Sequence, residues 1–223
     1  MEKSIISNSC NKEIAGFGQK AWVKQLASCS GMPLMLHQHA AGKRIVYLVL
    51  DCSTSMARKG KISHAKEGSI SFALEAVEKD YVVGLISFAS EAKHLLEPRH
   101  DISCIKNALE VIKARGSTNM ADAIIMAAER LSRMQGEKII TIVTDGQPDS
   151  DDETLEAAEV AKNAGISIMC IGTDDADTRF LEKLATRKEL SAKVEAAYLR
   201  QGITRMAGLL PDKRSVLQIT GGA

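Results

Sequence analysis

The residues best suited to bind a ligand or take part in chemistry follow an apolar, strand-sized run, Ile45–Leu50. Directly after it stand Asp51, Ser53 and Ser55, one carboxylate and two hydroxyls at alternate positions. Because successive side chains of an extended segment point to opposite sides, these three groups lie on the same side of the chain. Hard oxygen ligands of low total charge suit Mg²⁺ or Mn²⁺ better than zinc, since Mg²⁺ keeps some of its water molecules and accepts neutral hydroxyls. The segment therefore predicts part of a divalent-metal site.

Two more oxygen-bearing residues complete the set. Asp145 directly follows a second strand-like run, Lys138–Thr144, and Thr118 lies in a Gly-Ser-Thr-Asn loop that opens a helix. In a doubly wound sheet, ligands bind outside the carboxyl ends of the strands, at the point where the strand order reverses. If the strands that end before Asp51 and Asp145 are neighbours, all five oxygen-bearing side chains meet at one place.

Together these segments resemble the metal-ion-dependent adhesion site of von Willebrand factor type A domains, of the stand-alone kind found in bacteria and archaea. The shared features are Asp-x-Ser-x-Ser after a hydrophobic strand, a Thr in a Gly-Ser-Thr-Asn loop, and Thr-Asp-Gly after a second strand. They occur in the family's order and spacing over roughly residues 43–210. The bacterial motif most often has Gly where this sequence has Thr54, a change that removes no ligand but could stiffen the loop.

The resemblance implies a role for each of the five residues. Ser53 and Ser55 would bind the metal directly. Thr118 would bind it directly or through water, depending on the conformational state. Asp51 and Asp145 would act mainly through water. The remaining coordination position would accept a Glu or Asp carboxylate from a partner protein.

The function that this resemblance implies is a protein–protein interaction module with no enzymatic activity, an adaptor or regulatory subunit that depends on Mg²⁺ or Mn²⁺. Stand-alone members often act beside ATPases of the AAA type. An ATPase of that type, or its complex, is therefore an expected partner by analogy.

The main alternative is a Mg²⁺-dependent phosphatase or phosphotransferase of the haloacid-dehalogenase type, which also carries an Asp after its first strand. Such enzymes need a second carboxylate two residues later, as acid and base for the aspartyl-phosphate. Here that position is Ser53, and no suitably placed Lys is evident. A protein with a vestigial metal site is a third possibility, against which the complete set of ligands argues. The sequence therefore favours an interaction module.

The elements that must position these residues alternate between strand and helix from residue 44 onward, which is typical of a mostly parallel sheet covered on both faces. We expect a doubly wound, Rossmann-like α/β fold of about six strands, with one short antiparallel edge strand closed by Pro98. The expected strands are 45–50, 81–88, 92–96, 138–144, 166–171 and 192–196. Helices are expected between them, with Asp101 and Asp177 as N-caps and one helix over 153–164.

The chain divides into three parts on this pattern. Residues 1–43 form an N-terminal extension, with one helix and a connector. Residues 44–211 form the α/β domain, and residues 212–223 form a C-terminal tail. With 223 residues, one medium domain and its flanking segments account for the chain.

The composition excludes several other classes of function. A net charge of +1 argues against binding nucleic acid through a basic surface, and an aromatic content of 4% leaves few rings for stacking on bases. No segment approaches the roughly 18 apolar residues of a membrane-spanning helix, and the first residues lack the apolar core of a secretory signal. We therefore expect a cytoplasmic protein with neither nucleic acid nor membrane as partner. Five widely spaced cysteines indicate reduced, mostly buried thiols.

The loops expected at the carboxyl edge of the sheet are acidic, despite the near-neutral total. Their acidic residues are Asp51, Asp145, Asp149, Asp151, Asp152, Glu153, Asp174, Asp175 and Asp177, and their basic residues are Arg58, Lys59, Lys61 and Arg115. We therefore expect a partner that offers one carboxylate to the metal and basic residues to this acidic rim.

Overall fold

The apolar run before Asp51 forms the central strand β1 (Arg44–Asp51), and all eight of its residues are buried. Burial on both faces explains why the run is continuously apolar instead of alternating. The computed structural model describes residues 43–173 and 175–212. Apart from Lys43 and Asp212, the expected N-terminal extension and C-terminal tail lie outside these residues.

Within the described residues, six strands form one sheet in the order β3-β2-β1-β4-β5-β6. All neighbours are parallel except β3, which runs antiparallel to β2. The other strands are β2 (Tyr81–Phe88), β3 (Ala92–Arg99), β4 (Glu137–Thr144), β5 (Ser167–Thr173) and β6 (Ser191–Val194). Because β1 pairs with β2 on one side and β4 on the other, the strand order reverses between β1 and β4. This confirms the doubly wound fold and the expected pairing of the two strands that precede the metal motif.

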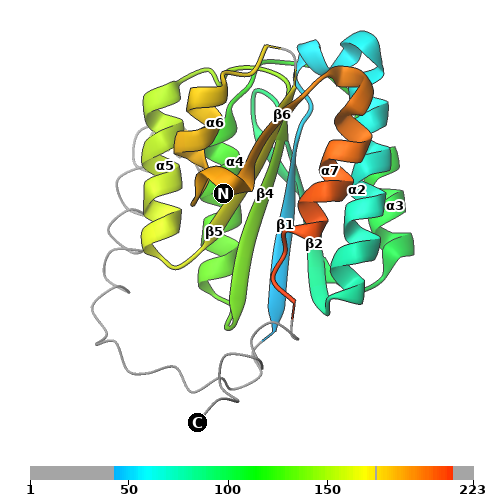
Figure 1. The fold of residues 1–223 in the computed structure, drawn as a ribbon, viewed down its shortest axis with the longest axis vertical. Helices are drawn as coiled ribbons and strands as arrows, with labels where there is room; N and C mark the ends of the chain where they lie inside the picture. The colour runs from blue at the N-terminus through cyan, green and yellow to red at the C-terminus, as the bar shows by residue number, and fades with distance from the viewer. Residues whose placement is uncertain (1–42, 174, 213–223) are drawn as a thin grey trace, which may run out of the picture.

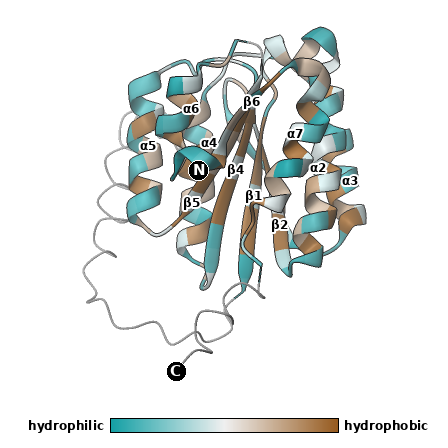
Figure 2. Ribbon diagram, in the orientation of Figure 1, coloured by the Kyte–Doolittle hydropathy of each residue, from teal (hydrophilic) through white to brown (hydrophobic). Residues whose placement is uncertain are grey.

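Helices cover both faces of the sheet, as expected (Figure 1). One layer contains α2 (Lys61–Glu78), α3 (Ile102–Glu110) and α7 (Leu199–Gly208). The other contains α4 (Met120–Ser132), α5 (Asp151–Asn163) and α6 (Thr178–Leu184). Three short 3₁₀ segments lie in the connections: η1 (Thr54–Gly60), η2 (Lys188–Leu190) and η3 (Ala196–Tyr198). Figure 2 shows hydrophobic residues along the strands and polar residues on the outer sides of the helices.

Side-chain caps fix where four of the described helices begin, including α4, where Asn119 accepts the N–H of Asp122. Asp101 accepts hydrogen bonds from two main-chain N–H groups of α3, and Asp177 accepts one from α6, as expected. Ser150 caps α5, so that helix begins at Asp151, two residues before the expected start at 153. The early start places three acidic residues in its first turn, where the helix dipole favours them.

The edge strand β3 is longer than predicted. The sequence indicated that Pro98 would close a short strand near Leu96, but β3 continues to Arg99. Proline has no N–H to donate, and an edge strand tolerates this because one side of it has no partner strand. The pairing of β3 with β2 shifts register between Val83 and Ile86, which accommodates the irregularity.

Two basic side chains, those of Lys79 and Arg44, anchor the C-terminal end of α7 near the start of β1. Lys79 Nζ donates to the carbonyls of Ala207, Gly208 and Leu210 at 2.8, 3.1 and 3.1 Å. Arg44, the first residue of β1, donates through Nη2 to the carbonyl of Pro211. Cations at a helix C-terminus satisfy carbonyls that have no partner within the helix and face the negative end of its dipole.

No helix within residues 43–173 and 175–212 is long and apolar enough to cross a membrane.

Candidate metal centre

The candidate centre lies at the carboxyl edge of the sheet, where β1 and β4 end side by side. Asp51 is the last residue of β1, and Asp145 directly follows Thr144, the last residue of β4. Their side chains are almost completely inaccessible, with 0% of Asp51 and 1% of Asp145 exposed. Two buried carboxylates therefore meet at the switch point of the sheet, and such groups require compensating partners.

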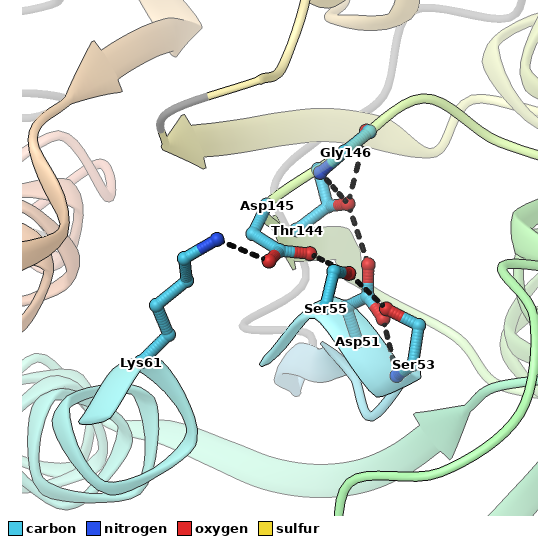
Figure 3. Close-up of polar contacts among 7 residues, drawn as sticks. All are labelled: Asp51, Ser53, Ser55, Lys61, Thr144, Asp145 and Gly146. Carbon is cyan, nitrogen blue, oxygen red and sulfur yellow. Dashed lines mark hydrogen bonds and ion pairs between the residues drawn. The ribbon is translucent and has the colours of Figure 1, made fainter. Parts of the chain in front are cut away.

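Asp51 is held by hydrogen bonds to both of its carboxylate oxygens. Its Oδ1 accepts the main-chain N–H of Ser53 at 2.7 Å, and its Oδ2 accepts the hydroxyl of Thr144 at 2.7 Å (Figure 3). Burial raises the pKa of Asp51, and the nearby carboxylate of Asp145 raises it further, whereas the hydrogen bonds from Ser53 and Thr144 lower it. The net direction is upward, because burial disfavours the charged form most.

The two serine hydroxyls link the carboxylates into one network. Ser53 Oγ and Ser55 Oγ are 2.9 Å apart, and Ser55 Oγ donates to Asp145 Oδ1 at 2.7 Å. Figure 3 shows the two serine side chains, at the N-cap and first turn of η1, close to Asp145, which follows β4. Four of the five predicted site residues therefore form a continuous hydrogen-bonded network.

Thr118, the fifth predicted residue, lies in a loop that packs beside this network. The carbonyl of Gly116 accepts hydrogen bonds from both the main-chain N–H and the hydroxyl of Thr54, each at 3.0 Å. Thr118 donates its own N–H to Asp149 Oδ1 at 3.0 Å. Gly116 has a φ of +89°, and a Cβ there would lie 2.7 Å from Ser90 Oγ, so the loop requires glycine at this position.

A buried lysine side chain completes the centre. Lys61, the first residue of α2, is 2% exposed and places Nζ 2.5 Å from Asp145 Oδ2. The sequence counted Lys61 among the basic residues of the rim loops, whereas the structure places it at the start of α2 with its side chain buried. Within the described residues of the rim, Arg58, Lys59 and Arg115 are exposed, as are the acids Asp149, Asp151, Asp152, Glu153, Asp175 and Asp177.

The donor set fits a hard divalent cation. Two carboxylates and two hydroxyls converge, and a cation would relieve the repulsion between the carboxylates. Across residues 43–173 and 175–212 there is no group of three or more His, Cys, Asp and Glu side chains that could hold a metal ion. An ion at this edge would therefore depend on the hydroxyls of Ser53 and Ser55 as well as on Asp51 and Asp145, which favours Mg²⁺ or Mn²⁺ over zinc.

Three residues of this site were not identified from the sequence: Thr144, Asp149 and Lys61. Thr144 could have been identified from the sequence, because it precedes Asp145 in the Thr-Asp-Gly motif and ends the strand. Asp149 is one of several acids before α5, and the sequence does not single it out. Lys61 follows Gly60 at the start of a helix and had no signal for burial.

The model of the von Willebrand factor type A domain family matches residues 46–201. Among curated proteins, the thrombospondin-related anonymous protein of Plasmodium falciparum is 27% identical over 141 residues, which are 57% of this chain and 25% of that protein. The inter-alpha-trypsin inhibitor heavy chain H4 of Bos taurus is 32% identical over 158 residues, which are 63% of this chain and 17% of that protein. The chain thus spans a quarter or less of the length of these relatives.

Solved structures show the same fold. The vWF domain of the type V pili tip protein Mfa5 from Porphyromonas gingivalis aligns with a TM-score of 0.69 at 13% identity, over 82% of this chain and 98% of that chain.

Proposed function

This chain belongs to the von Willebrand factor type A domain family, and we propose that it is a protein-interaction module whose binding depends on a divalent cation. Ser53 and Ser55 would hold Mg²⁺ or Mn²⁺ directly. Thr118, Asp51 and Asp145 would complete its surroundings. The observation that carries the proposal is the hydrogen-bonded network from Asp51 through the two hydroxyls to Asp145, at the switch point of the sheet.

The chain's own residues prepare this site for a cation. Asp145 accepts a hydrogen bond from the Ser55 hydroxyl, which leaves a lone pair of that oxygen facing Ser53. Thr144 and the N–H of Ser53 fix the carboxylate of Asp51, so that it needs no rearrangement on binding. The bound cation would supply a charge-assisted contact for a Glu or Asp carboxylate of a partner.

The partner is a protein that offers this carboxylate. Two relatives support an interaction role, since one solved neighbour is a pilus adhesin of Lactobacillus rhamnosus and another is a pilus tip protein. An AAA-type ATPase stays a proposed partner on the family resemblance alone, and adaptor function and cytoplasmic location stay predictions. The division of the chain at residues 44 and 211 is likewise proposed.

The first test is whether the site binds metal. We expect wild type to bind Mg²⁺ and Mn²⁺ in calorimetric titrations, and Ser53→Ala to bind at least about 10-fold more weakly, because a direct ligand is lost. Ser69→Ala is the matched control, since this buried serine of α2 has no hydrogen-bond partner for its hydroxyl among the described residues. Equal affinity in wild type and Ser53→Ala would contradict the proposed ligand set.

The second test concerns the partner. Proteins captured with Mg²⁺ should be lost on adding a chelator and should not be captured by Asp51→Ala. Capture that is insensitive to metal and survives Asp51→Ala would overturn the proposal. Turnover of a generic phosphoester that disappears in the same variant would favour the enzymatic alternative.

A further inference from the structure

Lys61 is unusual both in its burial and in its place on α2. Its side chain is 3% exposed, and its ammonium group contacts a carboxylate that is 0% exposed. It occupies the first position of a helix whose first turn contains no acidic residue. The positive end of the helix dipole disfavours a cation there, and burial of an ammonium group is costly as well. The ion pair with Asp145 offsets part of this cost.

The two residues directly before Lys61 have an unusual backbone conformation. Lys59 has a φ of 53° and Gly60 a φ of 67°, so two consecutive residues adopt the left-handed conformation. Such a conformation is unfavourable for lysine and persists when surrounding contacts enforce it. These two residues end η1 directly before α2, and the Lys61 side chain extends from the start of α2 toward Asp145 (Figure 3).

The position of Lys61 changes the charge of the centre. Asp51, Asp145 and Lys61 together carry −1, so a divalent cation brings these groups to +1. Without Lys61 the same two carboxylates and a divalent cation would sum to zero. The ammonium group also competes with the cation for Asp145, since both carboxylate oxygens of Asp145 are already engaged, one by Ser55 and one by Lys61.

We propose that Lys61 sets the charge of the metal centre: it weakens the binding of the cation and strengthens the attraction of the loaded centre for an anionic carboxylate. This inference rests on the proposed metal-dependent function. Electrostatic attraction at a buried site is strong enough to matter, because the effective dielectric constant there is far below that of water. A loaded centre with excess positive charge would discriminate against neutral amide and hydroxyl ligands, and so would select a Glu or Asp side chain.

The test compares Lys61→Gln and Lys61→Met with wild type, using Mn²⁺ as the metal and acetate as the carboxylate probe. Lys61→Gln keeps a hydrogen-bond donor for Asp145 and so guards against misfolding of the apolar variant. Lys66→Gln is the matched control, because Lys66 lies on the same helix and donates to the carbonyl of Glu110 instead of to the centre. Circular dichroism confirms that each variant is folded.

Water-proton relaxation measures both the affinity for Mn²⁺ and the affinity of the loaded centre for acetate. Protein-bound Mn²⁺ enhances the relaxation, and acetate lowers this enhancement by displacing water from the metal. At low ionic strength we expect Lys61→Gln to bind Mn²⁺ at least about 10-fold more tightly than wild type, and its loaded centre to bind acetate several-fold more weakly. Lys66→Gln should match wild type in both. A purely structural ion pair would not produce tighter metal binding on its removal.

The outcomes separate the two proposals. If wild type binds Mn²⁺ and Lys61→Gln binds it equally or more weakly, the charge-setting role is overturned and the metal centre stands. Unchanged acetate affinity in the loaded variant would likewise overturn the proposed selection of carboxylates. If neither wild type nor the variants bind Mn²⁺, both the proposed function and this inference fail.

Discussion

Cys52 lies between residues of the candidate centre, yet its thiol takes no part in that network. The side chain is 5% exposed and donates to the carbonyl of Leu50 at 3.5 Å. Of the described cysteines, Cys52 and Cys170 are buried, Cys104 is half-buried, and all three are free. This agrees with the expectation of reduced thiols, whereas Cys10 and Cys29 lie outside the described residues.

Cys170 should be chemically inert in the folded protein. Burial raises its pKa to about 12, so the reactive thiolate is scarce at pH 8. We expect iodoacetamide to modify Cys170 at least about 100-fold more slowly in the native protein than in denaturant. Mass spectrometry of the labelled peptides measures both rates, with Cys104 as the half-buried reference in the same sample. Rapid labelling of native Cys170 would contradict its burial.

At this scale the sequence predicted the oxygen-bearing side chains that form the hydrogen-bonded network, and it missed the buried Lys61. Asp51 and Asp145 directly follow apolar strands, so their positions depend on a local pattern that can be read along the chain. Lys61 reaches Asp145 only through the turn with two left-handed residues, Lys59 and Gly60. No periodicity encodes that turn, and an isolated lysine in a loop is usually exposed.

Among the elements, α7 depends most visibly on side chains from outside its own sequence. Lys79, which follows α2, supplies hydrogen bonds to three carbonyls at the C-terminal end of α7. The inward face of α7 includes Ile203 and Met206, which are both buried. The anchor at its end could not be predicted, because it joins segments far apart in the chain.

Replacing Lys79 should therefore destabilise the domain. We expect Lys79→Met to lower the free energy of unfolding by about 1–3 kcal/mol, since charged hydrogen bonds to partly buried carbonyls are lost. Urea denaturation followed by circular dichroism measures the change. Lys93→Met, on the exposed edge strand β3, removes the same charge and should be close to neutral. A comparable loss in both variants would argue against the anchor.

Considered as a whole, the molecule concentrates exposed acidic residues near the candidate centre. The acid Asp149 contacts the N–H of Thr118, and α5 begins with three exposed acids directly afterwards. Alternation of strand and helix predicted the fold at this scale, since few arrangements bury such a pattern. The alternation of strand and helix does not determine where each element ends. The length of β3 depends on its position at the edge of the sheet, and the start of α5 depends on its N-cap.

The acidic start of α5 should attract cations at long range. We expect the combined variant Asp151→Asn, Asp152→Asn and Glu153→Gln to bind Mn²⁺ about twofold more weakly than wild type at low ionic strength. The difference should vanish in about 0.5 M NaCl, because salt screens exposed charges over these distances. Calorimetric titration at the two salt concentrations measures it. A difference that persists at high salt would indicate a direct structural effect on the centre.

The hydrogen bond from Arg44 to Pro211 has a mechanical consequence. It joins the beginning of β1 to Pro211, shortly after the end of α7, at one end of the sheet, while the metal motif occupies the opposite end. Tension applied through the flanking segments would enter and leave the domain at this one place. The load would fall on the Arg44 contact and the last turn of α7, and the loops around Asp51 and Asp145 would remain outside the line of force.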